Sequence, residues 1–137
     1  MADAPIPDVA FLRAMMAGQE TWVAALPSGQ PAGFAVAGPL GGGFHLRELS
    51  VDPAHGRRGI GTALVETVVA ASRESGLAGV SLTTFRDVPF NAPFYARLGF
   101  EELALDRAEP ALRDAFAREV PAGVDPARRV LMWRPSD

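Results

Sequence analysis

One segment, Phe44 to Phe85, constrains the fold more than any other part of the chain. It reads as a strand to Val51, a glycine-rich loop, a helix that begins after Gly61 and ends near Ser75, and a strand from Gly79. A strand–helix–strand order demands a right-handed crossover, which places the two strands parallel in one sheet. We therefore predict a domain that combines a sheet with helices, of the α/β or α+β class.

The flanking segments add mostly antiparallel strands. Short turns separate the strands expected over Thr21–Leu26 and Gly33–Ala37 from the strand that begins at Phe44, which predicts an antiparallel meander. Asp8 is expected to cap a helix that runs to Met16. Further along we expect a short helix from Asn91 to Leu98, a strand from Phe100 to Leu105, a helix from Pro110 and a last strand from Arg129 to Arg134.

Composition bounds what such a domain can do. The 137 residues fit a single domain, residues 1–137. A net charge of −3 argues against nucleic acid or a membrane surface as a partner. No apolar stretch approaches the ~18 residues of a membrane span, and the start lacks the features of a signal peptide, so we expect a cytoplasmic protein.

Missing residue types exclude several chemistries. There is no cysteine and no lysine, so thiol nucleophiles, Schiff bases and a phosphate-loop lysine are excluded. Only two histidines are present, His45 and His55, so a three-histidine zinc site is impossible and we expect no metal. We expect both histidines at the surface.

The strand that begins at Phe44 changes its apolar parity. Phe44 and Leu46 are apolar at even positions, whereas Leu49 and Val51 are apolar at odd ones. One inserted residue after Arg47, a β-bulge, produces this switch, and bulges often lie beside functional sites. A strand buried on both faces would also lose its alternation, and the pattern alone leaves both interpretations open.

The loop before the first predicted helix has the features of an anion site. Its three glycines let backbone N–H groups approach an anion, and the helix start adds unpaired N–H groups and the positive end of the helix dipole. Arg57 and Arg58 add charge and bidentate phosphate recognition. These features favour a diphosphate ligand; a tight loop with two solvated arginines is the alternative.

A second group of residues surrounds the only asparagine and the only tyrosine of the chain. Asn91 suits the N-cap of a helix that contains Pro93, and Tyr95 lies one turn later, where its phenol can face a cleft. Taken alone, this pattern favours a simple cap and a core aromatic side chain.

Both groups of residues together resemble the GNAT acyl-CoA N-acetyltransferase superfamily. The resemblance rests on Leu49 to Pro53, on Arg57 to Gly61, and on Phe94 to Phe100, in this order and on the expected elements. It covers roughly residues 21–105, and the last strand also fits. It implies a sheet splayed into a V, with acetyl-CoA in the split.

The resemblance also implies roles for individual residues. Tyr95 would protonate the departing CoA thiolate, and Glu48 would accept the proton of the amine. The backbone of Leu49 to Val51 would pair with the pantetheine arm. The full set of expected cofactor contacts is Leu49, Ser50, Val51, Arg57, Arg58, Gly59, Ile60, Gly61, Thr62 and Asn91.

Three departures from the family pattern stand out. Gly56 occupies a position where the family usually has Gln or Arg. Val88 occupies the usual position of the asparagine near the cofactor, and Asn91 lies three residues later. The usual first strand and helix are lacking, which would leave the strand over Thr21–Leu26 as a bare edge. Because bare edges recruit partners, we expect self-association as a homodimer.

The function implied is transfer of acetyl from acetyl-CoA to a primary amine of a small molecule or peptide. A non-catalytic acyl-CoA-binding or regulatory module is the main alternative, and a nucleotide-binding domain is a weaker one. Arg86 and Asp87, at the end of the second cleft strand, suit a charged acceptor group, although a salt bridge within the loop is the preferred interpretation.

Overall fold

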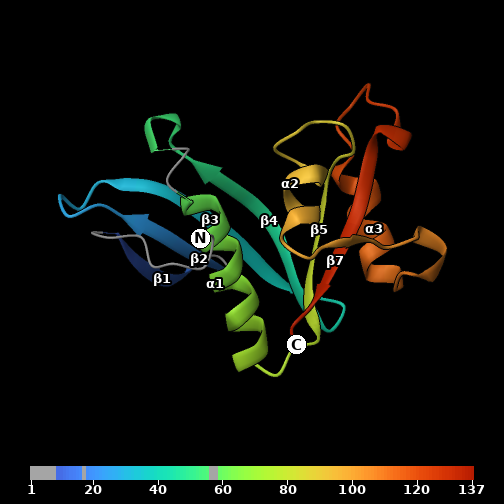
Figure 1. Cartoon of the computed structure of the whole chain (residues 1–137). Helices are drawn as coiled ribbons and strands as arrows, with labels where there is room; N and C mark the ends of the chain where they lie inside the picture. Colours follow the sequence, from blue (N-terminus) through green and yellow to red (C-terminus); the bar gives the residue numbers. More distant parts are fainter. Residues whose placement is uncertain (1–8, 17, 56–58) are drawn as a thin grey trace.

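A seven-stranded sheet in the order β1-β2-β3-β4-β5-β7-β6 forms the frame of the molecule (Figure 1). The computed structural model describes residues 9–16, 18–55 and 59–137. The strands are β1 (Ala10–Met16), β2 (Gln19–Ala25), β3 (Pro31–Leu40), β4 (Gly43–Val51), β5 (Gly79–Phe85), β6 (Glu101–Glu102) and β7 (Arg129–Pro135). The α-helices are α1 (Ile60–Glu74), α2 (Ala92–Arg97) and α3 (Pro110–Glu119). Only β4 and β5 pair in parallel, so the predicted mixed, mostly antiparallel sheet is confirmed.

The amino-terminal segment differs from the sequence prediction. The stretch expected to be a helix after Asp8 is strand β1, which pairs antiparallel with β2 along its whole length. The prediction that the strand over Thr21–Leu26 forms a bare edge is therefore wrong, because β1 is the edge strand of the sheet instead. The expected self-association as a homodimer stays a prediction. In the described residues no α-helix lies before α1; a single 3-10 turn, Pro53–His55, comes between β4 and α1.

Later elements follow the prediction with smaller changes. Strand β5 has the predicted bounds, and α1, α2 and β7 agree with them to within two residues. The strand expected from Phe100 to Leu105 is reduced to β6, because Leu105–Arg107 forms a 3-10 turn.

The sheet carries helices on both faces, and β7 separates the two cores. Val130 and Met132 belong to the main core, which α1 covers and which also contains Tyr95 and Phe100. Leu131 points to the other face, where it joins a smaller cluster with Ala108, Leu112 and Phe116. Because side chains alternate along a strand, one short strand contributes to both layers.

Strands β4, β5 and β7 come closest together near the carboxyl terminus (Figure 1). A Cβ atom on Gly43 would lie 2.5 Å from the carbonyl oxygen of Gly79, and one on Gly79 would lie 2.6 Å from Trp133 Cζ2. No side chain fits at either position. The two glycines therefore let β4 and β5 meet at the point from which they diverge.

Candidate functional site

The split between β4 and β5 is the first feature of the site. The two strands pair at only two positions, Phe44 with Val80 and His45 with Ser81, and then separate (Figure 1). A cavity of about 270 Å³ lies in the split. It is lined by Leu46, Arg47, Glu48, Leu49, Leu82, Thr83, Thr84, Phe85, Asn91, Tyr95 and Arg129. Four residues that the sequence predicted for the site, Glu48, Leu49, Asn91 and Tyr95, thus share one cavity.

A β-bulge in β4 shapes one wall of this cavity. Val36 pairs with Glu48 and the next residue, Ala37, pairs with Leu46, so Arg47 is the extra residue. The bulge predicted from the parity switch is confirmed. In a regular strand, consecutive side chains point to opposite faces. Because of the bulge, Arg47 and Glu48 both line the same cavity.

The divergence of β4 from β5 leaves backbone groups of β4 available to a ligand. Beyond His45, the edge of β4 that faces β5 has no ladder with it. Leu49 and Val51 are half-buried on this stretch, and Ser50 is exposed. An extended chain carrying amide groups could add to this edge as a strand does.

Tyr95 forms the wall on the side of α2. Its ring is buried edge-on between Phe94 and Phe100, with centroid distances of 5.1 and 5.6 Å. Burial raises the pKa of the phenol to about 12, because the charged phenolate loses its hydration. Tyr95 is therefore neutral at physiological pH and holds a proton that it can donate.

The titration of Tyr95 can be measured directly, because it is the only tyrosine. We expect the near-ultraviolet tyrosinate absorbance of the folded chain to rise with a midpoint near pH 12, and that of the urea-unfolded chain to rise near 10.0. Because the unfolded chain ionises first, stability should fall as the pH rises from 10.0 to about 12. A folded-state midpoint at the unfolded value would contradict the burial of the hydroxyl.

Asn91 occupies the N-cap position of α2, but its side chain does not cap the helix. Instead, Thr84 Oγ1 on β5 donates a 2.7 Å hydrogen bond to Asn91 Oδ1. The capping role predicted from the sequence is therefore wrong. The side chain ties the start of α2 to β5, beside Tyr95.

The start of α1 forms the other end of the split. Gly59 adopts a left-handed conformation (φ 77°), Ile60 is buried, and no side chain caps the helix. A Cβ atom on Gly61 would lie within 4 Å of Val51 on β4 and of Phe94 beside Tyr95. The first-turn N–H groups therefore lie near the end of the split. Arg57 and Arg58 fall outside the described residues.

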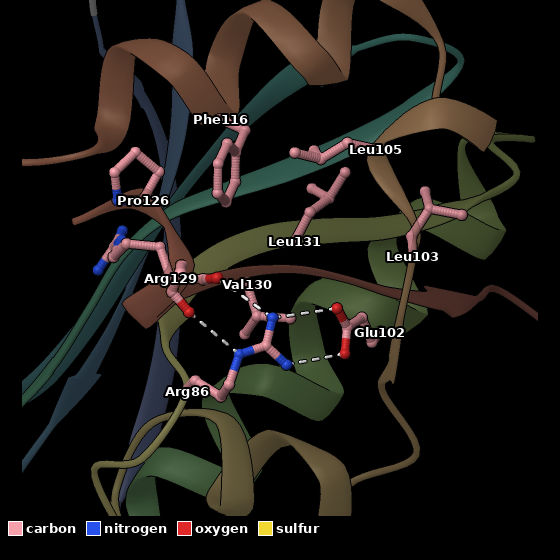
Figure 2. Close-up of a pocket in the computed structure, with 10 residues that line it drawn as sticks. Arg86, Glu102, Leu103, Leu105, Phe116, Pro126, Arg129, Val130 and Leu131 are labelled. Carbon is pink, nitrogen blue, oxygen red and sulfur yellow. Dashed lines mark hydrogen bonds and ion pairs between the residues drawn. The ribbon is translucent and has the colours of Figure 1, made fainter.

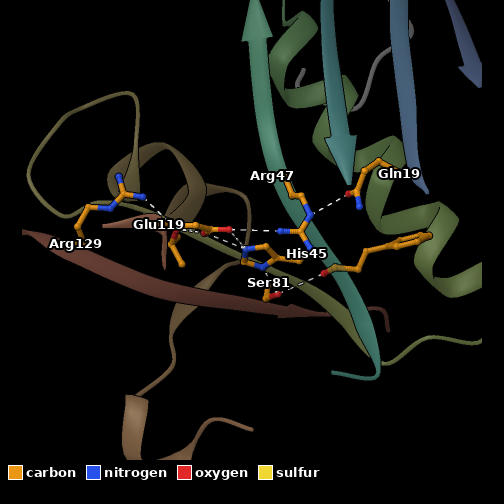
Figure 3. Close-up of polar contacts among 8 residues, drawn as sticks. Gln19, His45, Arg47, Ser81, Glu119 and Arg129 are labelled. Carbon is orange, nitrogen blue, oxygen red and sulfur yellow. Dashed lines mark hydrogen bonds and ion pairs between the residues drawn. The ribbon is translucent and has the colours of Figure 1, made fainter. Parts of the chain in front are cut away.

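A polar network that sequence reasoning missed closes the apex of the split (Figure 3). His45 was expected at the surface, yet it is fully buried, with Ser81 Oγ 2.8 Å from its Nδ1. In the tautomer that these contacts favour, its Nε2 donates to Glu119 Oε2 over 2.9 Å. Thr83 Oγ1 donates to the other oxygen of Glu119. Glu119, at the end of α3, thus joins β4 to β5 where their ladder stops.

Hydrogen bonds keep Glu119 ionised in this position. Burial alone would raise the pKa of this carboxyl group, but hydrogen bonds from His45 and Thr83 and the charge of Arg47 outweigh burial and leave the pKa lowered. Arg47 Nη1 lies 3.7 Å from Glu119 Oε2, and Arg47 Nε donates to Gln19 Oε1 over 2.9 Å.

A second cavity, of about 240 Å³, lies beside β6, β7 and α3 (Figure 2). Its charged lining residues are Arg86, Glu102 and Arg129, and Arg86 makes two hydrogen bonds of 2.9 and 3.1 Å to Glu102. The partner of Arg86 is therefore a carboxylate from β6 rather than Asp87 of the same loop. Neither Tyr95 nor Glu48 lines this cavity, so it is the weaker candidate for the reaction site.

The described residues hold neither a membrane-spanning helix nor a group of metal-ligating side chains. No described helix has the length and apolar character needed to cross a bilayer. Within the same part of the chain, no three His, Asp or Glu side chains are grouped to hold a metal ion.

Comparison with known proteins places these features in a wider group. The family model described as acetyltransferase (GNAT) domain matches residues 17–102. An acetyltransferase of the GNAT family from Staphylococcus aureus is 19% identical, with a TM-score of 0.68 over 88% of this chain and 69% of that one. The ribosomal-protein-S18-alanine N-acetyltransferase from Escherichia coli is 20% identical, with a TM-score of 0.67 over 90% and 72%.

Some of the similar structures were solved with a ligand. The PaiA N-acetyltransferase from Thermoplasma acidophilum, in complex with coenzyme A, is 17% identical, with a TM-score of 0.60 over 86% of this chain and 61% of that one. At these identities the structures establish a common fold.

Proposed function

Because this chain belongs to the GNAT family of acetyltransferases, we propose that it transfers an acetyl group from acetyl-CoA to a primary amine. One observation carries the proposal: Glu48 and Tyr95 line the same cavity, in the split where β4 and β5 part. A base and a protonated acid are the two groups that amine acetylation by a thioester needs.

The residues of the split fit acetyl-CoA. The unpaired edge of β4 at Leu49 and Val51 suits the amides of the pantetheine arm, with Ser50 between them. The uncapped start of α1, from Gly59 to Thr62, suits the diphosphate. We include Arg57 and Arg58 in this diphosphate site, and Asn91 as a contact near the thioester.

Acetyl-CoA supplies the acetyl group as a thioester and leaves as a thiol. Glu48 takes a proton from the amine as its nitrogen forms a bond to the acetyl carbon. Backbone N–H groups beside the bulge polarise the carbonyl oxygen. Tyr95 gives its phenolic proton to the sulfur as the carbon–sulfur bond breaks, and it regains a proton from solvent. The amine thus loses one proton and the thiol gains one.

Two measurements on the full chain test this function. Calorimetry measures acetyl-CoA binding, and thiol release from acetyl-CoA is followed with peptides, polyamines, aminoglycosides and amino acids as acceptors. We expect binding and amine-dependent thiol release. Binding without thiol release would support the non-catalytic module instead, and displacement of CoA by ATP or NAD would support a nucleotide-binding domain.

The diphosphate site leads to a prediction on affinity. CoA should bind more tightly than pantetheine, and Arg58→Glu should weaken CoA about 10- to 100-fold, because a charge-assisted hydrogen bond contributes ~1.5–3 kcal/mol. The control is Arg118→Glu, on the exposed face of α3, which makes the same charge change. Equal CoA affinity in the two variants would remove Arg58 from the site.

A further inference from the structure

Two arginines face the cavity that Glu48 and Tyr95 share. Arg47 comes from the bulge of β4, and Arg129 is the first residue of β7. Figure 3 shows their guanidinium groups on either side of Glu119. The proposed transfer of acetyl to an amine gives neither arginine a role.

Arg129 has hydrogen-bonding capacity that the described residues do not use. Its Nη2 donates to Thr83 Oγ1 over 3.1 Å, but its Nε is buried and has no partner in the described part of the chain. The guanidinium lies 4.7 Å from the centroid of Phe85, which also lines the cavity. Burial lowers the pKa of Arg129, and the charge of Glu119 offsets part of this effect. A partly desolvated cation with an unused N–H favours an anionic ligand.

Glu119 does not satisfy the unused N–H of Arg129, because both of its carboxylate oxygens already accept other hydrogen bonds. Both accept from His45 Nε2, at 3.1 and 2.9 Å, and one also accepts from Thr83. Arg129 reaches Glu119 only through the Thr83 hydroxyl, and Arg47 stays 3.7 Å away, beyond hydrogen-bond length. Glu119 therefore lies near both cations but leaves their N–H groups free of a direct hydrogen bond to its carboxylate.

We propose that the acetyl acceptor is a small amino acid, whose carboxylate binds Arg129 and Arg47 while its amine faces Glu48 and Tyr95. This inference rests on the proposed function. A carboxylate matches the fork of guanidinium N–H groups, and the opposite charges of its two ends match the arginines and Glu48. The cavity volume, about 270 Å³, lies just below the ~300–1,000 Å³ of typical small-molecule sites and suits a small acceptor.

The test compares acceptors that differ only in the carboxylate. Thiol release from acetyl-CoA is measured with glycine, leucine, glutamate and β-alanine. Each acid is compared with its amide, in which a carboxamide replaces the α-carboxylate or, in β-alanine, the single carboxylate. We expect kcat/KM for at least one acid to exceed that of its amide about 10- to 100-fold. Rates are compared at equal concentrations of the deprotonated amine, so that the difference in amine pKa between acid and amide does not create the ratio.

Variants then assign the preference to the arginines. In Arg129→Gln, kcat/KM for the acid should exceed that for the amide by no more than about threefold, chiefly because KM for the acid rises. Arg47→Gln should reduce the same ratio in part. The matched control is Arg128→Gln: this exposed neighbour also lies over Phe85, at 5.5 Å, but does not line the cavity. It should keep the full ratio.

A binding measurement decides the proposal independently of turnover. In the presence of CoA, calorimetry compares the N-acetyl derivatives of the same acids and amides. Tighter binding of an acid, lost in Arg129→Gln, supports the proposal. Equal or absent binding of acids and amides overturns it. Transfer to amides at the same rate as to acids overturns the amino-acid proposal but still supports the proposed acetyltransferase function. Failure of acetyl-CoA itself to bind refutes the proposed function.

Discussion

Replacement of Tyr95 by phenylalanine is expected to lower kcat by ~10²–10⁴-fold, the usual contribution of general acid catalysis. A phenol is neutral at neutral pH even at its ordinary pKa, and burial raises the pKa of Tyr95 further, to about 12, so the wild-type protein holds the proton throughout the neutral range. Tyr95→Phe keeps the ring packed between Phe94 and Phe100 and removes only the hydroxyl. The measurement is thiol release at saturating acetyl-CoA and amine.

Acetyl-CoA affinity should be retained in Tyr95→Phe, which separates a loss of chemistry from a loss of binding. Phe94→Leu is the matched control, because it disturbs the packing around the ring but leaves the hydroxyl in place. Wild-type turnover in Tyr95→Phe would refute the role of the phenol as the acid.

Replacement of Glu48 by glutamine is the second large effect. Glutamine has nearly the same shape but cannot accept the amine proton, so kcat/KM near neutral pH should fall by ~10²–10⁴-fold. The variant then depends on amine that is already deprotonated in solution. Its rate should therefore keep rising with pH toward the pKa of the acceptor amine, and the measured pH–rate profile shifts to higher pH.

Glu74→Gln, at the exposed end of α1, is the control for the loss of one negative charge. It should show the wild-type profile. If Glu48→Gln also keeps that profile, the carboxylate is a bystander, and another base or water must deprotonate the amine.

The parts of the fold that local patterns encode were predictable. The parity of apolar residues in β4 limited the strand to two interpretations, and the structure confirms the bulge at Arg47; the parity was readable because the alternation of a strand is a property of consecutive residues. Strand β5 was predicted with its observed bounds, since turn-forming and charged residues flank an apolar, β-branched run.

The amino-terminal strand was not predictable in the same way. Val9 and Leu12 have helical spacing, yet the segment forms β1, in which Leu12 and Met15 are exposed. Backbone pairing with β2 along the whole strand outweighs the weak helical pattern. Such pairing depends on a partner strand and a tight turn, which the apolar pattern does not describe.

The polar network at the apex of the split joins residues that are far apart in the sequence. His45 and Glu119 are 74 positions apart, and a buried histidine is identified only when both of its partners are known. Tyr95 was predicted because it belongs to a motif with fixed spacing, and Glu48 because the family resemblance implies a carboxylate on strand β4. Thr83, Glu119 and Arg129 belong to no such motif, and only the arrangement of β5, α3 and β7 brings them together.

The attachment of Glu119 to α3 has a consequence for how this protein evolves. Helix α3 rests on the small cluster of Leu112, Phe116, Ala108 and Leu131, apart from the main core. Such a unit opens locally at a lower free energy than the whole domain. Each opening would withdraw Glu119 from His45 and Thr83 and remove the negative charge near Arg47 and Arg129. Under the proposed function, substitutions in this cluster are therefore expected to change acceptor choice more than acetyl-CoA binding, so that selection could act on the two substrates separately.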